Sequence, residues 1–332
     1  MLDQSPIAEG STGAQALHNT LELARLADAR GFFRYWVAEH HGGPMLAGPS
    51  PEALIGPIAA ATSRIRVGSG GVMLPHYSPF KVAETFSVLA GLFPGRIDLG
   101  IGRAAGTDPF TTHALQRDRS QPLPDDFPAQ LAELLAYFED RFPPENPLGR
   151  LAKALPGRPE TPDVWLLGSS PQSAIWAAEL GLPYAFADFI NPGGAEIAAL
   201  YRERFEPSHR SEVPRVAVAV WALAADSSAE AERLASSSRM AFSMLRRGRL
   251  IPIPPPEVAL RFLSQHGDEL LGRRRTIVGE PAAVRAGILE VADAYGASEA
   301  IVVTITYDHV ARLRSYELIA DAFAERPDAA AA

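Results

Sequence analysis

The chain has 332 residues, a hydrophobic content of 47% and a net charge of −8, so it can bury a large core in one or two domains. It contains no cysteine, which excludes disulfides, thiolate metal ligands and a cysteine nucleophile. No apolar run reaches the ~18 residues of a membrane span, and the negative charge argues against a general binder of nucleic acid or membrane surfaces. We expect a cytoplasmic protein that acts on a small molecule, with no nucleic-acid or membrane partner.

Strand and helix patterns alternate along the chain. The sequence predicts strands near residues 2, 36, 67, 98, 166, 186, 218 and 303, each followed by helical sequence. Serine and proline pairs at 50–51 and 78–79 mark helix starts, and Gly31 ends the first helix. Residues 107–123 are polar without clear periodicity, and residues 143–162 form a proline-rich connection.

Eight such units fit an α/β fold of the (β/α)8 TIM-barrel type, with residues 1–332 as a single domain. An open doubly wound sheet would need a nucleotide-binding glycine loop after its first strand, and the sequence has none there. Residues 246–275 are basic and proline-rich, with one short helical stretch near 258–263. They form a long insertion before the last strand, typical of a functional lid or a disordered segment.

The second strand runs directly into Glu39, His40 and His41. Because imidazoles titrate near neutrality, histidines at a strand end could serve as a general base, a hydrogen-bond donor or a metal ligand. Adjacent histidines on an extended chain point to opposite faces, so both would rarely bind one metal ion, and we expect no metal site. Instead of a metal site, one histidine could be catalytic while the other makes hydrogen bonds within a buried loop.

Glycines follow the third strand, in Gly68-Ser69-Gly70-Gly71. They allow the backbone to approach a flat ligand closely, but a tight bulge without a ligand explains them equally well. Arg103 follows the fourth strand, and Ser170 and Ser173 open the helix after the fifth. Free amides at a helix start, hydroxyls and a guanidinium suit a phosphate monoester, although ordinary helix capping also explains the serines.

Taken together, these stretches resemble the bacterial luciferase-like flavin monooxygenases over nearly the whole chain. The matching stretches are residues 2–6, 10–12, 35–41, 67–75, 94–103, 167–170, 278–281 and 302–308. The resemblance implies a (β/α)8 barrel, usually a homodimer, that uses reduced FMN (FMNH2) delivered by a separate NAD(P)H:flavin reductase.

Residue by residue, the resemblance implies a non-prolyl cis peptide at Gly70–Gly71, behind the flavin ring. It implies an FMN phosphate site at Arg103, Ser170 and Ser173. His40 matches the catalytic histidine of the light-emitting members, with Glu39 and His41 beside it, and residues 246–275 match the mobile loop that we expect to be the active-site lid.

The implied mechanism is addition of O2 to reduced FMN, giving a flavin C4a-peroxide that transfers one oxygen atom to the substrate in a dry pocket. Two departures from the family matter. The first strand is very short, and Gly102 stands where the luciferases have a reactive cysteine. Light emission is therefore not expected.

We read the chain as a non-luminous monooxygenase dependent on FMNH2 and O2. Its alanine, arginine and proline content suggests a tailoring step in natural-product biosynthesis, such as hydroxylation or epoxidation of a polyketide. One alternative is an F420-dependent oxidoreductase that transfers hydride. Another is a non-catalytic flavin-binding protein, against which Glu39, His40 and His41 argue.

Overall fold

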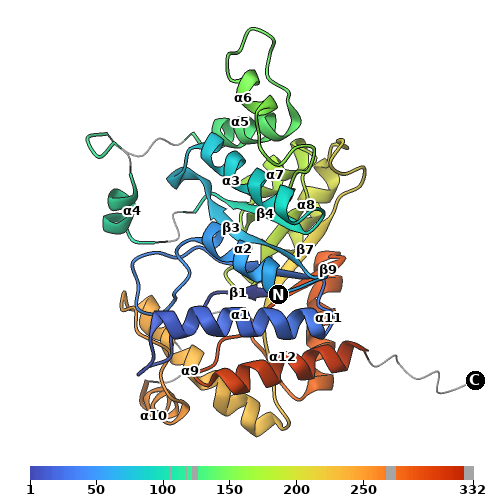
Figure 1. Cartoon of the computed structure of the whole chain (residues 1–332). Helices are drawn as coiled ribbons and strands as arrows, with labels where there is room; N and C mark the ends of the chain where they lie inside the picture. Colours follow the sequence, from blue (N-terminus) through green and yellow to red (C-terminus); the bar gives the residue numbers. More distant parts are fainter. Residues whose placement is uncertain (105–106, 117, 122–125, 267–273, 325–332) are drawn as a thin grey trace, which may run out of the picture.

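Within the residues that the computed structural model describes, nine parallel strands alternate with helices (Figure 1). These residues are 1–104, 107–116, 118–121, 126–266 and 274–324. All eight predicted strands are present. The prediction missed β8, because its three residues are too few to show an alternating pattern. The strands are β1 Leu2–Asp3, β2 Arg34–Val37, β3 Arg66–Met73, β4 Ile97–Gly102, β5 Asp163–Gly168, β6 Tyr184–Ala187, β7 Val216–Ala224, β8 Ile277–Gly279 and β9 Glu299–Val303.

Several helices begin where the sequence predicts them. Thr12 caps the first helix, since its Oγ1 accepts a hydrogen bond from the Gln15 amide at 3.1 Å, and several others begin with proline directly after serine. The helices are α1 Gly13–Ala29, α2 Pro51–Ala61, α3 Pro79–Leu92, α4 Pro109–Leu115, α5 Phe127–Glu139, α6 Gly149–Lys153, α7 Pro171–Glu179, α8 Ala195–Arg204, α9 Ser228–Arg246, α10 Pro256–His266, α11 Pro281–Tyr295 and α12 His309–Ala324, with a short 3-10 helix η1 at Leu74–His76.

The strands form one curled parallel sheet, consistent with a fold of the TIM-barrel type. They pair in chain order from β1 to β8, and β9 also pairs with β7. β1 and β9 contact each other, so the two ends of the sheet meet. The register sets Trp36 of β2 beside Leu2 of β1 and Gly68 of β3. The carboxyl ends of the strands therefore gather at one rim, where this fold type carries its active sites.

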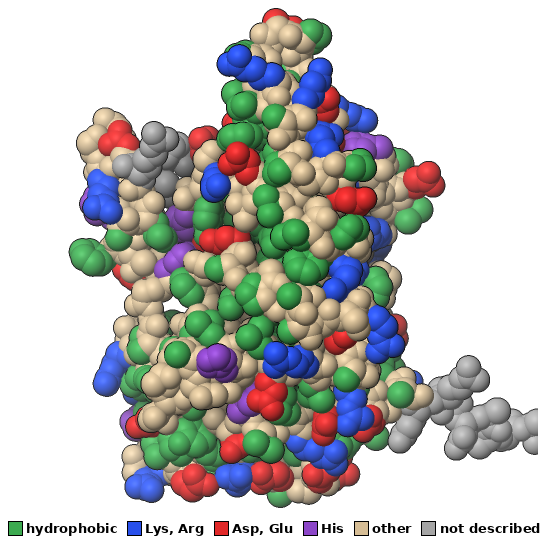
Figure 2. All heavy atoms as spheres, in the orientation of Figure 1, with side chains coloured by type: hydrophobic (Ala, Val, Ile, Leu, Met, Phe, Trp, Pro, Cys, Tyr) green, Lys and Arg blue, Asp and Glu red, His purple; other side chains and the backbone are tan. Residues whose placement is uncertain are grey.

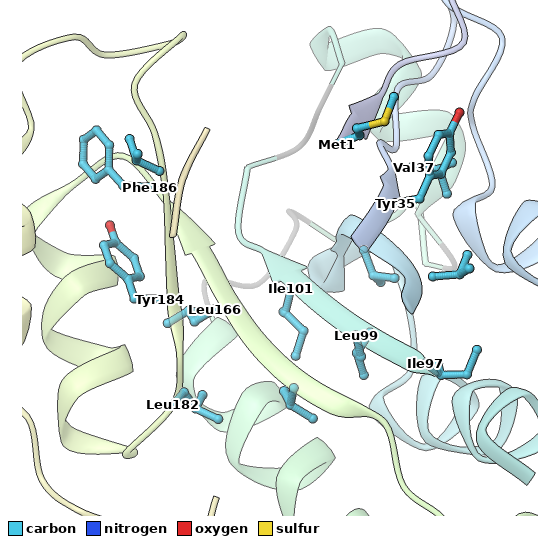
Figure 3. Packing of buried hydrophobic residues seen from close by; sticks show 14 of the residues in the cluster. Met1, Tyr35, Val37, Ile97, Leu99, Ile101, Leu166, Leu182, Tyr184 and Phe186 are labelled. Atoms are coloured by element: carbon cyan, nitrogen blue, oxygen red, sulfur yellow. The ribbon is translucent and has the colours of Figure 1, made fainter. Parts of the chain in front are cut away.

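Two hydrophobic cores lie on opposite faces of the sheet, because successive side chains of a strand point to opposite faces. The outer core lies between sheet and helices. On β4 it takes Ile97, Leu99 and Ile101, whose side chains point to the same side of the strand (Figure 3). The inner core contains Trp36 and Trp165, whose rings meet edge to face at 5.5 Å.

Charged side chains close the inner face at the amino ends of the strands. The Asp98 carboxylate is fully buried and pairs with Arg34 and Arg66, at 2.5 Å in each case. It also accepts a hydrogen bond from the indole Nε1 of Trp36 at 2.9 Å. A buried charge is tolerated where its hydrogen-bonding capacity is satisfied, as it is here.

Two helices lie where we predicted irregular structure. α4 falls within residues 107–123. None of its side chains is buried, so it has no apolar face for a periodicity analysis to detect, and its signal was Asp108, whose carboxylate accepts from the first-turn amides. α6, within residues 143–162, has only five residues. Both misses reflect helices too short or too exposed to produce an amphipathic pattern.

The insertion at residues 246–275 is partly packed, and residues 267–273 lie outside the described part of the chain. Its first half is anchored by Ile253, which exchanges 2.8 Å backbone hydrogen bonds with Ile7 and Glu9 and is buried. α10 is longer than predicted and packs against α9, with an ion pair of 2.9 Å between Arg233 and Glu257. The role of a lid stays a prediction.

Basic and acidic side chains are interspersed over the molecular face shown in Figure 2. Across the described ranges, no helix combines the length and the apolar character that crossing a bilayer requires. The same ranges hold no cluster of three or more histidine, aspartate or glutamate side chains arranged for a metal ion.

Candidate active site

A cavity of about 400 Å³ opens on the inner face of the sheet, toward the carboxyl ends of the strands. In a TIM barrel, layers of large side chains normally fill this space. Here the inner positions above the tryptophan pair are small, among them Gly70 on β3, Ala185 on β6 and Ala219 on β7. The remaining walls are mainly aliphatic and aromatic, and include Leu2, Trp36, Phe127, Leu167, Trp176, Phe186 and Ile301.

The cavity brings together all five residues that we predicted for cofactor binding: Gly70, Gly71, Arg103, Ser170 and Ser173. They come from β3, from the end of β4 and from the start of α7. Their only shared sequence signal is that each stands at or just after the end of a strand.

The peptide bond between Gly70 and Gly71 is cis, as the resemblance implied. The pairing of β3 with β4 skips from Gly70 to Val72, so Gly71 also forms the bulge that the sequence allowed. A Cβ on Gly70 would lie 2.7 Å from Leu2 Cδ1, and one on Gly71 would lie 2.7 Å from the Gly100 carbonyl oxygen. Gly71 is therefore required because the neighbouring backbone cannot move aside, whereas at Gly70 the Leu2 side chain could shift. The two glycines leave a surface without side chains in the cavity wall.

Ser170 and Ser173 form a capping box at the start of α7. The Ser173 hydroxyl donates to the Ser170 carbonyl at 2.8 Å and lies 2.9 Å from the Tyr184 hydroxyl, and it is buried. Ser170 stays exposed at the cavity rim. The capping interpretation of these serines is confirmed, and phosphate binding stays a prediction for a helix start that also lines the cavity.

Arg103 lies on the same rim, and its guanidinium carbon is 5.6 Å from the centre of the Trp176 ring. The amino end of α7 carries a partial positive charge from its peptide dipoles, and Arg103 adds a full one. This part of the rim is therefore suited to an anion such as a phosphate group. Trp176 was not predicted, because it lies within α7 and no strand end marks it.

Glu39 does not line the cavity, although it stands beside it. Its fully buried carboxylate accepts hydrogen bonds from the Met73 amide at 2.9 Å and the Tyr77 hydroxyl at 3.1 Å, and it lies 2.7 Å from Nε2 of His41. Met73 itself lines the cavity. Glu39 thus fixes the cavity wall and orients His41. Because its carboxylate already bonds to three groups of the protein, Glu39 acts as a positioning residue.

His40 and His41 differ in their surroundings. Burial, and then the neighbouring charge of His41, lowers the pKa of His40 to about 4, so His40 is neutral at pH 7. Its Nδ1 is buried without a hydrogen-bond partner among the described residues. The His41 ring pairs with Glu39 and meets the His76 ring edge to face at 5.8 Å. Neither histidine lines the cavity.

Residues 1–299 match the profile of the luciferase-like monooxygenase family. The chain is 44% identical over 326 residues to a luciferase-like monooxygenase of Escherichia coli K12, covering 97% of this chain and 95% of that protein. It is 38% identical over 332 residues to an N-acetyl-S-alkylcysteine monooxygenase of Bacillus subtilis 168, covering 97% of each.

Solved structures share the fold of this chain. The crystal structure of apo-MsnO8 superposes with a TM-score of 0.89 at 42% identity, covering 98% of this chain and 97% of that one. The fold is shared more distantly with a 3,6-diketocamphane monooxygenase solved with FMN (TM-score 0.70, 21% identity, 96% of each chain). It is also shared with an F420-dependent secondary alcohol dehydrogenase (TM-score 0.62, 16% identity, 93% of this chain and 94% of that one).

The fold and the cavity thus define an oxidoreductase of the flavin-dependent type. The chain belongs to the luciferase-like monooxygenase family, and it is a flavin-dependent monooxygenase.

Proposed function

We propose that the protein is an FMNH2- and O2-dependent monooxygenase that inserts one oxygen atom into an organic small molecule. The observation that carries this proposal is one apolar cavity with a bare Gly70–Gly71 wall and, at its rim, Arg103 and the start of α7. When bound, reduced FMN supplies the electrons for O2 cleavage, with one oxygen atom entering the substrate and the other leaving as water.

The cavity fits a flavin in size and in chemistry. Its volume of about 400 Å³ lies in the range of cofactor sites. Gly70 and Gly71 offer a flat backbone surface on which a planar ring could rest, since no side chain projects there. Arg103 and Ser170 would hold the phosphate at the amino end of α7, and Ser173 would keep that helix start in shape.

The apolar walls serve the chemistry by excluding water. Trp36, Phe127 and Leu167 line the cavity, and water or stray protons admitted there would divert activated oxygen to hydrogen peroxide. The same walls suit an apolar substrate or the apolar part of one. The reaction we propose is hydroxylation or epoxidation of a polyketide-type natural product.

We assign the proton-handling role to His40. Its imidazole is neutral at pH 7 because burial lowers its pKa to about 4, so Nδ1, which has no partner among the described residues, is available for a hydrogen bond. Because His40 does not line the cavity, we propose that a water molecule connects it to the reacting group. Glu39 and His41 act beside it, with Glu39 holding both His41 and the Met73 backbone in place.

The source of the reduced flavin is a further part of the proposal. We infer that a separate NAD(P)H:flavin reductase supplies FMNH2 and that the protein works as a homodimer in the cytoplasm, both on the strength of the family resemblance. The alternative cofactor is F420, since one F420-dependent dehydrogenase shares the fold.

An anaerobic binding titration with reduced FMN, oxidised FMN and reduced F420 tests the choice of cofactor. Reduced FMN should bind most tightly. Rapid mixing of that complex with O2 should then give oxygenated product when a substrate is present and hydrogen peroxide when none is. Tighter binding of F420, or hydrogen peroxide as the only product with every substrate screened, would overturn the proposal.

A further inference from the structure

A second, smaller cavity of about 230 Å³ lies next to the first. The two share Ile190 in their walls. They are also stacked along β7, because Ala219 lines the first cavity and Trp221, two residues further on the same face of the strand, lines the second. A molecule lying against the flavin could therefore extend past Ile190 into the second cavity.

The second cavity is basic. Arg239 and Arg246 of α9 line it together with Arg274, and no acidic side chain is among the described residues of its wall. Arg239 pairs with Glu232 outside the cavity. These guanidiniums converge although they come from two segments separated in the chain, which a motif search would not detect.

Arg274 is held by aromatic rings. Its guanidinium carbon lies 3.8 Å from the centre of the Phe242 ring and 5.7 Å from that of Trp221. In the described part of the chain, no carboxylate comes within ion-pair distance of it. Burial, and then the charge of Arg246, lowers its pKa to about 10, so it remains a cation at neutral pH while losing part of its hydration.

The neighbouring indole adds a hydrogen-bond donor. Trp221 is buried, and its Nε1 has no hydrogen-bond partner among the described residues. Guanidiniums and an indole N–H can only donate, so the group that would satisfy this wall is an acceptor with negative charge. The Phe242 and Trp221 rings would pack against the apolar part of the same molecule.

We propose that the second cavity binds an oxyanion group of the substrate, so that the substrates are organic acids whose apolar part reaches into the first cavity. This inference rests on the proposed function, because it takes the first cavity to hold the flavin beside which that apolar part is oxidised. Carboxylates, sulfonates and phosphates share the required chemistry.

Binding to the full-length protein loaded with FMN tests this inference, with calorimetry as the readout. The probes are 4-phenylbutanoate, 4-phenylbutane-1-sulfonate and the uncharged 4-phenylbutanamide. At least one acid should bind about 10- to 100-fold more tightly than the amide, because charge-assisted hydrogen bonds to a partly buried guanidinium are strong. The acid that binds better identifies the oxyanion geometry preferred.

Arg274→Met should reduce the preference for the acid about tenfold and leave amide binding unchanged, since Arg239 and Arg246 stay in the wall, and Arg274→Lys should restore part of the preference. The matched control is Arg247→Met, which removes an exposed arginine that lies over Phe262, away from this cavity. FMN affinity, measured separately for each variant, should not change.

Equal binding of acid and amide, or a preference that is undiminished in Arg274→Met, would contradict the inference. An Arg274→Met variant that loses FMN affinity instead would show that the cavity serves the cofactor. If the wild-type protein did not bind FMN at all, the proposed function would fail. The inference would then be tested on the flavin-free protein by the same acid and amide pair.

Discussion

The two ends of the curled sheet are built from the same strands but in opposite ways. At the amino ends, inner positions are large and charged, and the buried carboxylate of Asp98 is paired with Arg34 and Arg66. At the carboxyl ends, inner positions such as Gly70 and Ala219 are small and leave a cavity. One end is closed by paired charges, and the other keeps room for a ligand, with Trp221 Nε1 lacking a partner among the described residues.

This difference separates residues that hold the fold from residues that act on a ligand. Asp98 has no capacity left for a substrate, since its two buried carboxylate oxygens already accept four hydrogen bonds from Arg34, Trp36 and Arg66. His40 Nδ1 and Trp221 Nε1 are buried without a hydrogen-bond partner among the described residues, an arrangement that costs stability and therefore suggests a role in binding. Changes at the amino end should therefore affect stability, and changes at the carboxyl end should affect binding and turnover.

The largest expected effect is on stability, from Asp98→Asn. Removing the charge weakens the pairing of the Arg34 guanidinium, which is only 2% exposed and keeps Glu299 as a second partner, and should lower the free energy of unfolding by about 3 kcal/mol. Urea denaturation measures the loss. Asp163→Asn is the control, because its carboxylate is 27% exposed and should cost about 1 kcal/mol or less. Similar losses for the two variants would contradict the assignment of Asp98.

His40→Ala should lower the rate of oxygen transfer about 100-fold while leaving FMN affinity and the urea midpoint nearly unchanged. Product formed per FMNH2 oxidised, with a substrate found by screening, is the measurement. Glu39→Gln should have a smaller effect on transfer, because the amide oxygen can still accept from Met73. Wild-type product yield from His40→Ala would remove this residue from the mechanism.

The pH profile sharpens the assignment of His40. Its pKa is lowered from 6.5 to about 4, so the neutral imidazole persists well below pH 6.5. Oxygen transfer that needs the neutral form should stay level from pH 7 to about pH 5 and fall as the pH approaches 4. A fall centred near pH 6.5 would show that a different, solvated histidine controls the reaction.

Gly71→Ala tests the bare wall of the cavity. The new Cβ would meet the Gly100 backbone at 2.7 Å, and backbone atoms cannot move aside as a side chain can. We expect a loss of about 1–3 kcal/mol of stability together with weaker FMN binding. Gly13→Ala is the control, since its Cβ would find only ordinary contacts at 3.6 Å and beyond. Unchanged FMN affinity in folded Gly71→Ala would argue against a flavin resting there.

The smallest effect concerns Asp28, which binds the loop that leads into the amino end of β3. Burial raises its pKa, but hydrogen bonds from the amides of Ser63, Arg64 and Ile65 outweigh this and lower it to about 2. A lowered pKa adds stability that is present above about pH 4 and is lost as the pH falls toward 2. Asp28→Asn should lack this component, at a cost below about 1 kcal/mol at pH 7, as followed by thermal unfolding.

Much of this organisation could be predicted from the sequence because the residues of the site stand at or just after the ends of predicted strands. The strands, the helix starts after Ser50, Ser78 and Ser170, and the convergence of Gly70, Arg103 and Ser173 all follow from local patterns repeated in order. The cis peptide at Gly70–Gly71 followed from the family resemblance and not from the glycines alone.

The remaining features depend on tertiary packing. Nothing in the run Glu39-His40-His41 indicates that the Glu39 carboxylate bonds to Met73 and Tyr77, or that none of the three side chains lines the cavity. β8 and α4 are too short or too exposed to show periodicity. The second cavity joins α9 to the end of the insertion around Arg274, and their proximity has no local sequence signal.

The most direct test of the central claim compares FMNH2 with reduced riboflavin, which has the same ring but no phosphate, in anaerobic titrations of the wild-type protein and Arg103→Met. If the cavity holds FMN with its phosphate between Arg103 and the start of α7, FMNH2 should bind about tenfold or more tightly than reduced riboflavin. Arg103→Met should remove most of that difference without weakening riboflavin binding. Equal affinities for the two flavins in the wild-type protein would contradict this account of the site.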